Sequence, residues 1–519
     1  MGSSCSAMPP PDVLIDWRTH NNAMTEIVQR VTAAGAIAPG WPAGAVRLNY
    51  AWINHVSAAD GAGGLFEAYE QSDIGLERTR GDAVQLPNAT PYSWPVGNPG
   101  DLKLYPGIAS DGAGGCYVGW AGQYFGATWY WVLNRMQSDG TASPDWPAEG
   151  LPVGSWTSPP AAGPVLSQDP MGGVYVGWVG NGVRLKRYNG EGTLGAGWPS
   201  GGLLLAPTGT DVDKLIALVP SGSDHVIAMW NQTPSGSPAT RVLLKRIGRD
   251  HIPDPAWPVS GVELMNSTQP IKSLGLVSDG QGDVWAFWET SSTPFVRHFQ
   301  SSGTPTFLSP VSPLDAAAQY VNDLYAVHGR DDGLIVGWTD SRPSRPGVRL
   351  RWIRSDGTPD PAEPDSARAA SPHYPPDFMG PLRAFNRGLL DDGQGGAYVA
   401  WDYRAGPLWE LVYLGHLGPS SVLGVAPGST PRAALALRSV TPNPAAREVQ
   451  VRFTLAEAGP ARLELLDISG RLVRSLEVPG ARSEQVARFE DLGRLLPGLY
   501  VVRLAQGGSA RSARVAIVR

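Results

Sequence analysis

The residues of this sequence that could do chemistry are scattered, and few share a spacing typical of a catalytic or metal site. The eight histidines form no HExxH motif or equivalent, and the chain has neither a G-x-S-x-G elbow nor a P-loop. Six carboxylates could meet at one end of a ring-shaped fold, as glycoside hydrolysis requires: Asp16, Glu67, Glu70, Glu289, Asp340 and Asp402. Carboxylates at the ends of solvated strands are also ordinary surface groups. We therefore expect no catalytic residue, cofactor or metal site, and a glycoside hydrolase or polysaccharide lyase remains the alternative.

Aromatic side chains gather in one segment, GQYFGATWYWVLNR at 122–135. Tyr124, Phe125, Trp129 and Trp131 could form a platform on which sugar rings or another flat apolar ligand stacks. Packing inside the fold accounts for Trp129 and Trp131 equally well. The segment predicts a ligand platform, with internal packing as its competing interpretation.

The stretch SDGAGGCYVGW at 110–120 joins an acidic, glycine-rich turn to an apolar strand. Aspartate opens tight turns and glycine accepts positive φ, whereas a calcium loop needs oxygen ligands where glycine and alanine stand here. Cys116 aligns with an apolar residue in every related segment, so we expect a buried structural thiol. The stretch predicts a hairpin of the scaffold.

Related segments recur through the first four-fifths of the chain and set its architecture. Each ends on an aromatic residue: DVLIDW (12–17), GLFEAY (64–69), GCYVGW (115–120), GVYVGW (173–178), HVIAMW (225–230), DVWAFW (283–288), GLIVGW (333–338) and GAYVAW (396–401). The spacings between the closing aromatics are 52, 51, 58, 52, 58, 50 and 63 residues. Trp-Pro pairs recur with a similar period and follow the first five closing aromatics, at Trp41, Trp94, Trp146, Trp198 and Trp257. A sustained period of this size indicates a repeat fold, with about four short strands in each unit.

We call these recurring segments the marker strands and expect each to be the first strand of its repeat unit. In each of them both alternating faces are apolar. A strand that is apolar on both faces is covered on both sides, as in a ring of packed four-stranded blades. Residues 1–425 are therefore predicted to form an all-β propeller. Eight marker strands favour eight blades, and seven remains an alternative because the first repeat shows no strand ahead of its marker. A solenoid of antiparallel sheets is a further alternative.

The charge distribution separates the C-terminal residues from the rest of the chain. The net charge is −6, and residues 430–519 hold 14 arginines, no lysine and 8 acidic residues, which leaves −12 on residues 1–429. A negative propeller argues against nucleic-acid binding, which needs a basic stripe. No run of 18 apolar residues is present to span a membrane, and the opening MGSSCSAMPPPD lacks the apolar core of a secretory signal. If the protein is exported, its leader is expected to lie outside this sequence.

The C-terminal residues lose the glycine turns and read as about seven short alternating strands over some 85 residues, the size of an immunoglobulin-like sandwich. A linker rich in proline and glycine at 426–434 precedes this second domain at 435–519. The segment carries Pro442-Asn443-Pro444, then Asp467-Ile468-Ser469-Gly470-Arg471, then Pro497-Gly498-Leu499-Tyr500, and it closes on Arg519. With these motifs it resembles the C-terminal sorting domain of bacterial type IX secretion cargo, a relative of the Ig-like domain of flagellar hook-assembly proteins. Arg511, Arg514 and Arg519 stand where that family usually has a lysine.

The resemblance implies export by the type IX secretion machinery and a location outside the cell or on its outer surface. The glycine-turn repeats likewise resemble the propeller repeats that often precede such domains. We therefore expect a secreted or cell-surface propeller that acts as a non-catalytic binding or structural module, with a glycan or a surface protein as its ligand.

Overall fold

The protein divides into two compact units, residues 1–421 and residues 422–519, in a computed structural model. The structure describes residues 4–518 except for the segments 8–11, 19–24, 33–35, 43–45, 51–53, 71–73, 90–101, 125–127, 148, 161, 207–210, 235, 292, 308, 313–320, 341–346, 365–366, 371–382, 405–409, 419–435, 443–444, 456–459, 468–470, 479–484 and 507–508.

The first unit is all-β and consists of consecutive antiparallel sheets, most of them four-stranded, as in a propeller. Within the described residues there are eight such sheets, and in each the strands pair in chain order. The first is β1 (Ser4–Ala7), β2 (Asp12–Arg18), β3 (Thr25–Thr32) and β4 (Val46–Tyr50). The second is β5 (His55–Ala59), β6 (Leu65–Glu70), β7 (Ile74–Thr79) and β8 (Gln85–Ala89). The third is β9 (Lys103–Ser110), β10 (Cys116–Tyr124), β11 (Thr128–Met136) and β12 (Leu151–Trp156).

The remaining five sheets continue this order. The fourth is β13 (Val165–Gln168), β14 (Val174–Gly180), β15 (Gly182–Tyr188) and β16 (Leu203–Leu204). The fifth is β17 (Asp211–Ser221), β18 (His225–Thr233), β19 (Thr240–Gly248) and β20 (Val262–Ser267). The sixth is β21 (Ile271–Ser278), β22 (Val284–Thr290) and β23 (Thr293–Phe299), and the seventh is β24 (Val321–His328), β25 (Leu334–Asp340), β26 (Gly347–Ile353) and β27 (Arg368–Ala369). The eighth is β28 (Arg383–Asp391), β29 (Ala397–Arg404) and β30 (Glu410–Leu417).

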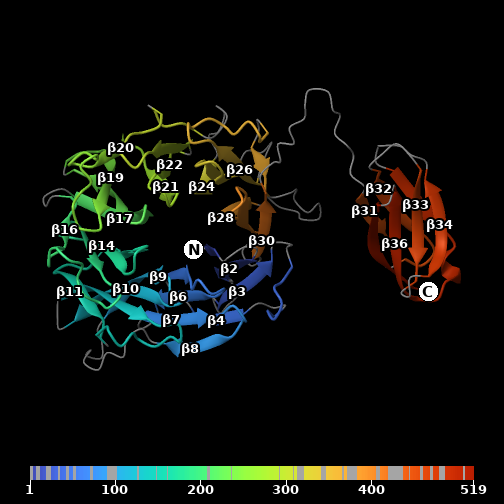
Figure 1. Ribbon diagram of the computed structural model, residues 1–519, viewed down its shortest axis with the longest axis horizontal. Helices are drawn as coiled ribbons and strands as arrows, with labels where there is room; N and C mark the ends of the chain where they lie inside the picture. The colour runs from blue at the N-terminus through green and yellow to red at the C-terminus, as the bar shows by residue number, and fades with distance from the viewer. Residues whose placement is uncertain are drawn as a thin grey trace. The chain divides into compact units, whose positions relative to one another are not determined.

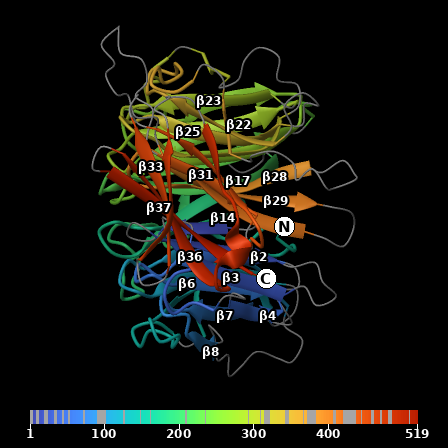
Figure 2. The ribbon, with the colours of Figure 1, turned by 90° about the vertical axis from the view of Figure 1, so that its right-hand side faces the viewer.

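The sheets of this unit surround a common axis. The first strand of each sheet contacts the first strand of the next, through β1, β5, β9, β13, β17, β21, β24 and β28, and β28 contacts β1. Figure 1 shows these first strands on the inner side and strands such as β8, β11 and β20 on the outer side. In Figure 2, β28 and β29 run along the axis about which the sheets are arranged.

The core of the first unit lies between neighbouring sheets. Separate hydrophobic clusters join the first sheet to the second and so on to the eighth. A last cluster joins Val13 and Ile15 of β2 to Tyr398 of β29, and so links the first sheet to the eighth. This arrangement explains why the marker strands are apolar on both faces: β6 and β25 are buried along their whole length.

The marker strand is the second strand of its sheet, not the first as the repeat units of the sequence implied. The run that precedes each glycine-rich turn, such as Ile271–Ser278, is the innermost strand of the same sheet. The first sheet does have a leading strand, β1, which pairs with β2. The repeat boundaries expected from the sequence therefore fall one strand after the boundaries of the sheets.

The glycine-rich turns are held by their aspartates, as predicted. Asp111 Oδ1 accepts from the backbone N–H groups of Ala113 at 2.7 Å and Gly115 at 2.8 Å, and Oδ2 accepts from Arg135 of β11 at 2.9 Å. A Cβ on Gly115 would lie 2.3 Å from the carbonyl oxygen of Met136, so glycine is required there. Asp60 and Asp392 repeat the backbone contacts, and each also contacts a side chain of the third strand, Arg78 and His416 respectively. The next residue after this turn, Cys116, is fully buried, and burial raises the pKa of its thiol.

The tryptophans of the Trp-Pro pairs connect adjacent sheets. Each described indole is buried and donates its Nε1–H to a backbone carbonyl in the turn after the third strand of the next sheet. The four bonds run from Trp41 to Gly81, Trp146 to Gly190, Trp198 to Arg249 and Trp257 to Ser301, at 2.8–2.9 Å. Trp94 lies outside the described residues. The marker thus has a structural role in joining sheet to sheet.

Within its described residues the second unit has seven strands in two sheets, close to the number that its sequence pattern predicted. One sheet is β31 (Ala436–Thr441), β32 (Val449–Thr454) and β35 (Gln485–Phe489). The other has the order β34 (Leu472–Val478), β33 (Ala461–Leu466), β36 (Gly498–Gln506) and β37 (Ser509–Ile517). The short helix η1 (Leu492–Arg494) precedes β36. One hydrophobic core, which includes Phe453, Leu463 and Val502, draws on both sheets.

Candidate functional site

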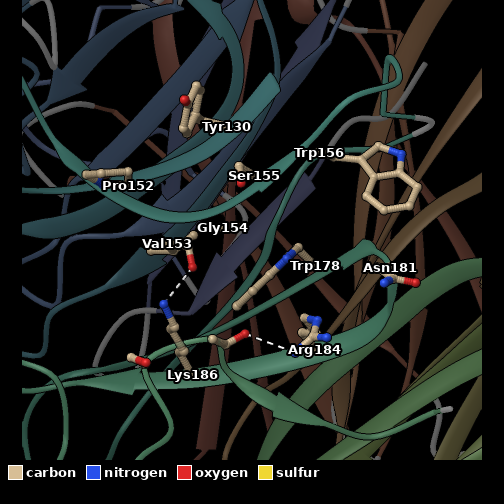
Figure 3. Close-up of a pocket in the computed structure, with 12 residues that line it drawn as sticks. Tyr130, Pro152, Val153, Gly154, Ser155, Trp156, Trp178, Asn181, Arg184 and Lys186 are labelled. Atoms are coloured by element: carbon tan, nitrogen blue, oxygen red, sulfur yellow. Dashed lines mark hydrogen bonds between the residues drawn. The ribbon is translucent and has the colours of Figure 1, made fainter. Parts of the chain in front are cut away.

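A pocket of about 580 Å³ opens between the third and fourth sheets. Tyr130 of β11 and Trp156 at the end of β12 line one side of it. Trp178 of β14, with Arg184 and Lys186 of β15, lines the other side (Figure 3). The pocket therefore combines aromatic and cationic groups from two sheets.

Lys186 is the deeper of the two cations. It is 6 % exposed, its Nζ donates to the carbonyl oxygen of Val153 at 2.7 Å, and Nζ lies 5.7 Å from the centre of the Trp178 ring. Burial, and after it the neighbouring Arg184, lower the pKa of Lys186. The carbonyl and the ring fix the ammonium group at the floor of the pocket and give it no counter-charge.

Arg184 lies nearer the rim. Its guanidinium donates to the carbonyl oxygens of Gly201 at 3.1 Å and Gly202 at 3.3 Å. None of the described residues that line the pocket is an aspartate or a glutamate. The pocket is therefore cationic on a unit whose sequence is strongly acidic overall, and its electrostatics favour an anionic ligand.

The aromatic side chains differ in what they offer a ligand. Trp178 is 2 % exposed and packs against Trp131, with ring centres 6.3 Å apart. Trp156 is only partly buried, and Figure 3 shows its indole at the right of the view, where Asn181 of the facing sheet also lies. Trp156 is thus a ring on which a flat ligand can stack.

The predicted aromatic platform is only partly described. Trp129 and Trp131 are 3 % and 0 % exposed and belong to the cluster between the third and fourth sheets, so for these two residues the packing interpretation holds. This corrects their assignment as stacking surfaces, because a buried ring cannot face a ligand. Phe125 and the side chain of Tyr124 lie outside the described residues, and their role stays a prediction.

The six carboxylates considered for catalysis do not share one environment. Asp16 and Glu67 come together with His55, their ligand atoms lying within 4.8 Å of one another. Glu70 instead accepts from the side chain of Asn54 and from the backbone N–H of Tyr105. Glu289 and Asp340 are buried in β22 and β25, and the side chain of Asp402 lies outside the described residues.

The sequence motifs of the second unit lie at its turns and strand starts. Asp467 Oδ1 accepts from the backbone N–H of Arg471 at 3.0 Å, which closes the turn between β33 and β34. Tyr500, two residues after Gly498 opens β36, donates its hydroxyl to the carbonyl oxygen of Leu496 at 2.8 Å. Pro442 follows β31 directly and is exposed. Asn443, Pro444, Gly470 and Arg519 lie outside the described residues.

Residues 439–518 match the family model of the secretion system C-terminal sorting domain. The chain carries a secretion sorting domain. This domain marks a protein for secretion to the cell surface or the extracellular medium, so the predicted location is confirmed. A search of the curated proteins finds no match.

Solved structures similar to the chain share little sequence with it. PorZ, described as a bacterial surface component of the type-IX secretion system of Porphyromonas gingivalis, is 13 % identical with a TM-score of 0.32, covering 100 % of this chain and 70 % of PorZ. The polysaccharide lyase Uly1 is 11 % identical with a TM-score of 0.40, covering 68 % of this chain and 90 % of the lyase. Prolyl oligopeptidase B from Galerina marginata is 9 % identical with a TM-score of 0.37, covering 63 % of this chain and 45 % of the oligopeptidase.

The pocket could not be predicted from the sequence because its parts lie on separate sheets. A signal was nevertheless present at Arg184, since the aligned residue is Val132 in the third sheet and Leu243 in the fifth. A cation in a slot that is apolar in both adjacent sheets marks a local departure from the repeat. Trp156 has no comparable signal.

Within the described residues, no helix is long and apolar enough to cross a membrane.

Proposed function

We propose that the protein is a secreted or cell-surface binding protein whose propeller holds an acidic glycan in the pocket between the third and fourth sheets. The observation that carries the proposal is the pairing of Arg184 and Lys186 with the partly exposed ring of Trp156 in a pocket lined by no described acid. Sugars bind through ring stacking and polar contacts, and uronate or sulfate groups add a negative charge that these cations favour.

The scaffold of this proposal is an eight-bladed propeller at residues 1–425, a linker at 426–434 and an Ig-like sandwich at 435–519. The cyclic order of contacts from β1 to β28 and back supports eight blades. The pairing of the second strand with the fifth and of the third with the sixth, together with the Tyr500 bond to Leu496, supports an Ig-like topology. The sorting domain supports recognition by the type IX secretion machinery as the route of export.

A non-catalytic role fits the described carboxylates better than the hydrolase or lyase alternative. Asp16 and Glu67 are 1 % and 2 % exposed, so a polysaccharide chain cannot reach them, although their closeness suits a glycosidase pair. Among the described residues, the pocket itself offers no acid–base pair of carboxylates. The alternative predicts release of reducing ends or unsaturated uronates from polysaccharides, which an assay on the purified chain detects directly.

A glycan array that includes neutral, uronate-containing and sulfated polysaccharides tests the binding proposal. The full chain should bind the acidic members, and Trp156→Ala and Arg184→Gln should each weaken binding at least about tenfold, the equivalent of about 1.4 kcal/mol. Arg241→Gln is the matched control, because Arg241 is an exposed arginine on the third strand of the next sheet and pairs with Glu263. Binding that is absent, confined to neutral glycans, or equal in all variants would reject the proposal.

A further inference from the structure

We propose that Asp16, His55 and Glu67 form a binding site for one divalent transition-metal ion between the first and second sheets. The carboxylate oxygens and the imidazole nitrogen that could bind the ion all lie within 4.8 Å of one another. The three residues come from β2, β5 and β6, whereas the pocket lies between the third and fourth sheets. The site goes beyond the proposed function and does not depend on it.

The internal repeat provides the first argument, because both carboxylates replace apolar residues. The slot of Glu67 is occupied elsewhere by Ile15, Val118, Val176, Ala228, Ala286, Val336 and Val399. The slot of Asp16 is occupied elsewhere by Ala68, Gly119, Gly177, Met229, Phe287, Gly337 and Ala400. Acids thus enter two otherwise apolar core positions only in adjacent repeats, and there they meet each other.

Strand register explains how the three side chains converge. In the second sheet His55 lies opposite Tyr69 and Ser57 lies opposite Glu67. Because residues two apart on a strand share a face, His55 and Glu67 project from the same face of that sheet. The first sheet contacts the second through β1 and β5, and Asp16 is the partner of Ser4 on β1. The fold therefore brings a third ligand to a preformed pair.

The donor set indicates the class of ion. Imidazole nitrogen suits zinc and other transition metals, whereas calcium and magnesium are bound by oxygen alone. Bonds of about 2.0–2.2 Å hold the ligand atoms of a zinc ion roughly 3–3.5 Å apart. Because the present separations are at most 4.8 Å, a contraction of at most about 1.3–1.8 Å suffices. A change of that size lies within the reach of small side-chain rotations.

Burial and access suit a bound ion. Asp16 is 1 % exposed and Glu67 is 2 % exposed, and two carboxylates this close repel each other strongly where water is excluded. A divalent cation between them converts that repulsion into attraction. His55 is only partly buried, which gives an ion a path from solvent.

Calorimetric titration of the EDTA-treated full chain with Zn²⁺, Mn²⁺ and Ca²⁺ in separate runs tests the site. We expect one Zn²⁺ or Mn²⁺ per chain and much weaker Ca²⁺ binding. Loss of a residue that only hydrogen-bonds to a metal ligand lowers metal affinity by roughly 10–100-fold. Asp16→Asn, Glu67→Gln and His55→Gln each alter a ligand itself, so each should lower the affinity by more than that. The matched control is Glu289→Gln, which removes an equally buried carboxylate in the sixth sheet and should leave binding unchanged.

A second measurement keeps the test decisive if a variant does not fold. The parent loaded with Co²⁺ should show the visible absorption bands of a site with one nitrogen and several oxygen ligands, and one equivalent of Zn²⁺ should abolish them. The proposal is overturned if the parent binds no ion stoichiometrically, or if the folded variants bind as the parent and the control do.

Discussion

Single aspartates decide the stability of the glycine-rich turns, and Asp169 is the clearest case. It is fully buried and accepts from Arg187 at 2.6 Å and from Arg249 at 2.9 Å, while the Arg187 side chain is only 3 % exposed. Asp169→Ala leaves the Arg187 charge buried without its carboxylate, which costs about 3–5 kcal/mol. Urea unfolding of the full chain measures this loss.

The matched comparison is Arg241→Ala, which breaks a pair whose side chains are 38 % and 40 % exposed. Because solvent screens that pair, its loss should cost at most about 1 kcal/mol. If the two variants lose the same free energy of unfolding, the buried pair stabilises the protein no more than the exposed pair does.

The buried carboxyl of Glu289 should make stability depend on pH. Burial is the main cause that raises the pKa of Glu289 above its ordinary value. A carboxyl with a raised folded pKa stabilises the protein below its unfolded pKa, and that contribution is lost as the pH rises through the folded value. Glu289→Gln removes the group that titrates, so the variant does not lose this contribution. The melting temperature of the variant minus that of the parent should therefore increase as the pH is raised from about 4 to about 7. A difference that stays constant or falls over this range would contradict the assignment.

At the scale of elements, the Trp-Pro tryptophans should contribute through their hydrogen bonds as well as through their volume. Trp198 Nε1 donates to the carbonyl oxygen of Arg249 in the next sheet at 2.8 Å. Trp198→Phe leaves that carbonyl without its donor and should cost about 1–3 kcal/mol beyond the loss of packing. Chemical unfolding measures the difference.

Trp230→Phe is the control, because Trp230 is equally buried and its Nε1 has no hydrogen-bond partner among the described residues. The two substitutions remove the same atoms, so subtracting their costs isolates the bond. If both variants lose the same stability, the indole bond between sheets contributes nothing measurable.

Elements that repeat were predictable from the sequence, and relations between elements were not. The marker strands, the aspartate turns and the buried slot of Cys116 follow from apolar periodicity and turn chemistry, which act over a few residues. The predicted boundaries between sheets fell one strand too late. The innermost strands, such as β1, do not end on the aromatic residue by which the second strands were recognised. The role of Trp198 could not be inferred, since its acceptor lies 51 residues away.

The candidate sites show the same division. Trp129 and Trp131 were recognised as aromatic residues, but a sequence does not tell a buried ring from an exposed one. The pocket depends on Trp156 and Arg184, which are brought together only when the third sheet packs on the fourth. Asp16 and Glu67 were noted as acids, and their convergence depends on packing between the first two sheets.

At the scale of the whole molecule, the two units should unfold separately because each has a core of its own. Among the described residues, the core of the second unit draws on residues between Leu437 and Ile517, and the clusters of the first unit draw on residues up to Leu417. Scanning calorimetry of the full chain should therefore show two transitions. Asp169→Ala should lower the transition of the first unit and leave the other in place.

Tyr500→Phe provides the reciprocal test, because it removes the bond to the Leu496 carbonyl at 2.8 Å inside the second unit. A lost hydrogen bond of about 0.5–1.5 kcal/mol lowers the melting temperature of a unit of this size by about 2–12 °C. Only the transition of the second unit should move. A single transition, or a shift of both by either substitution, would mean that the two units unfold as one body.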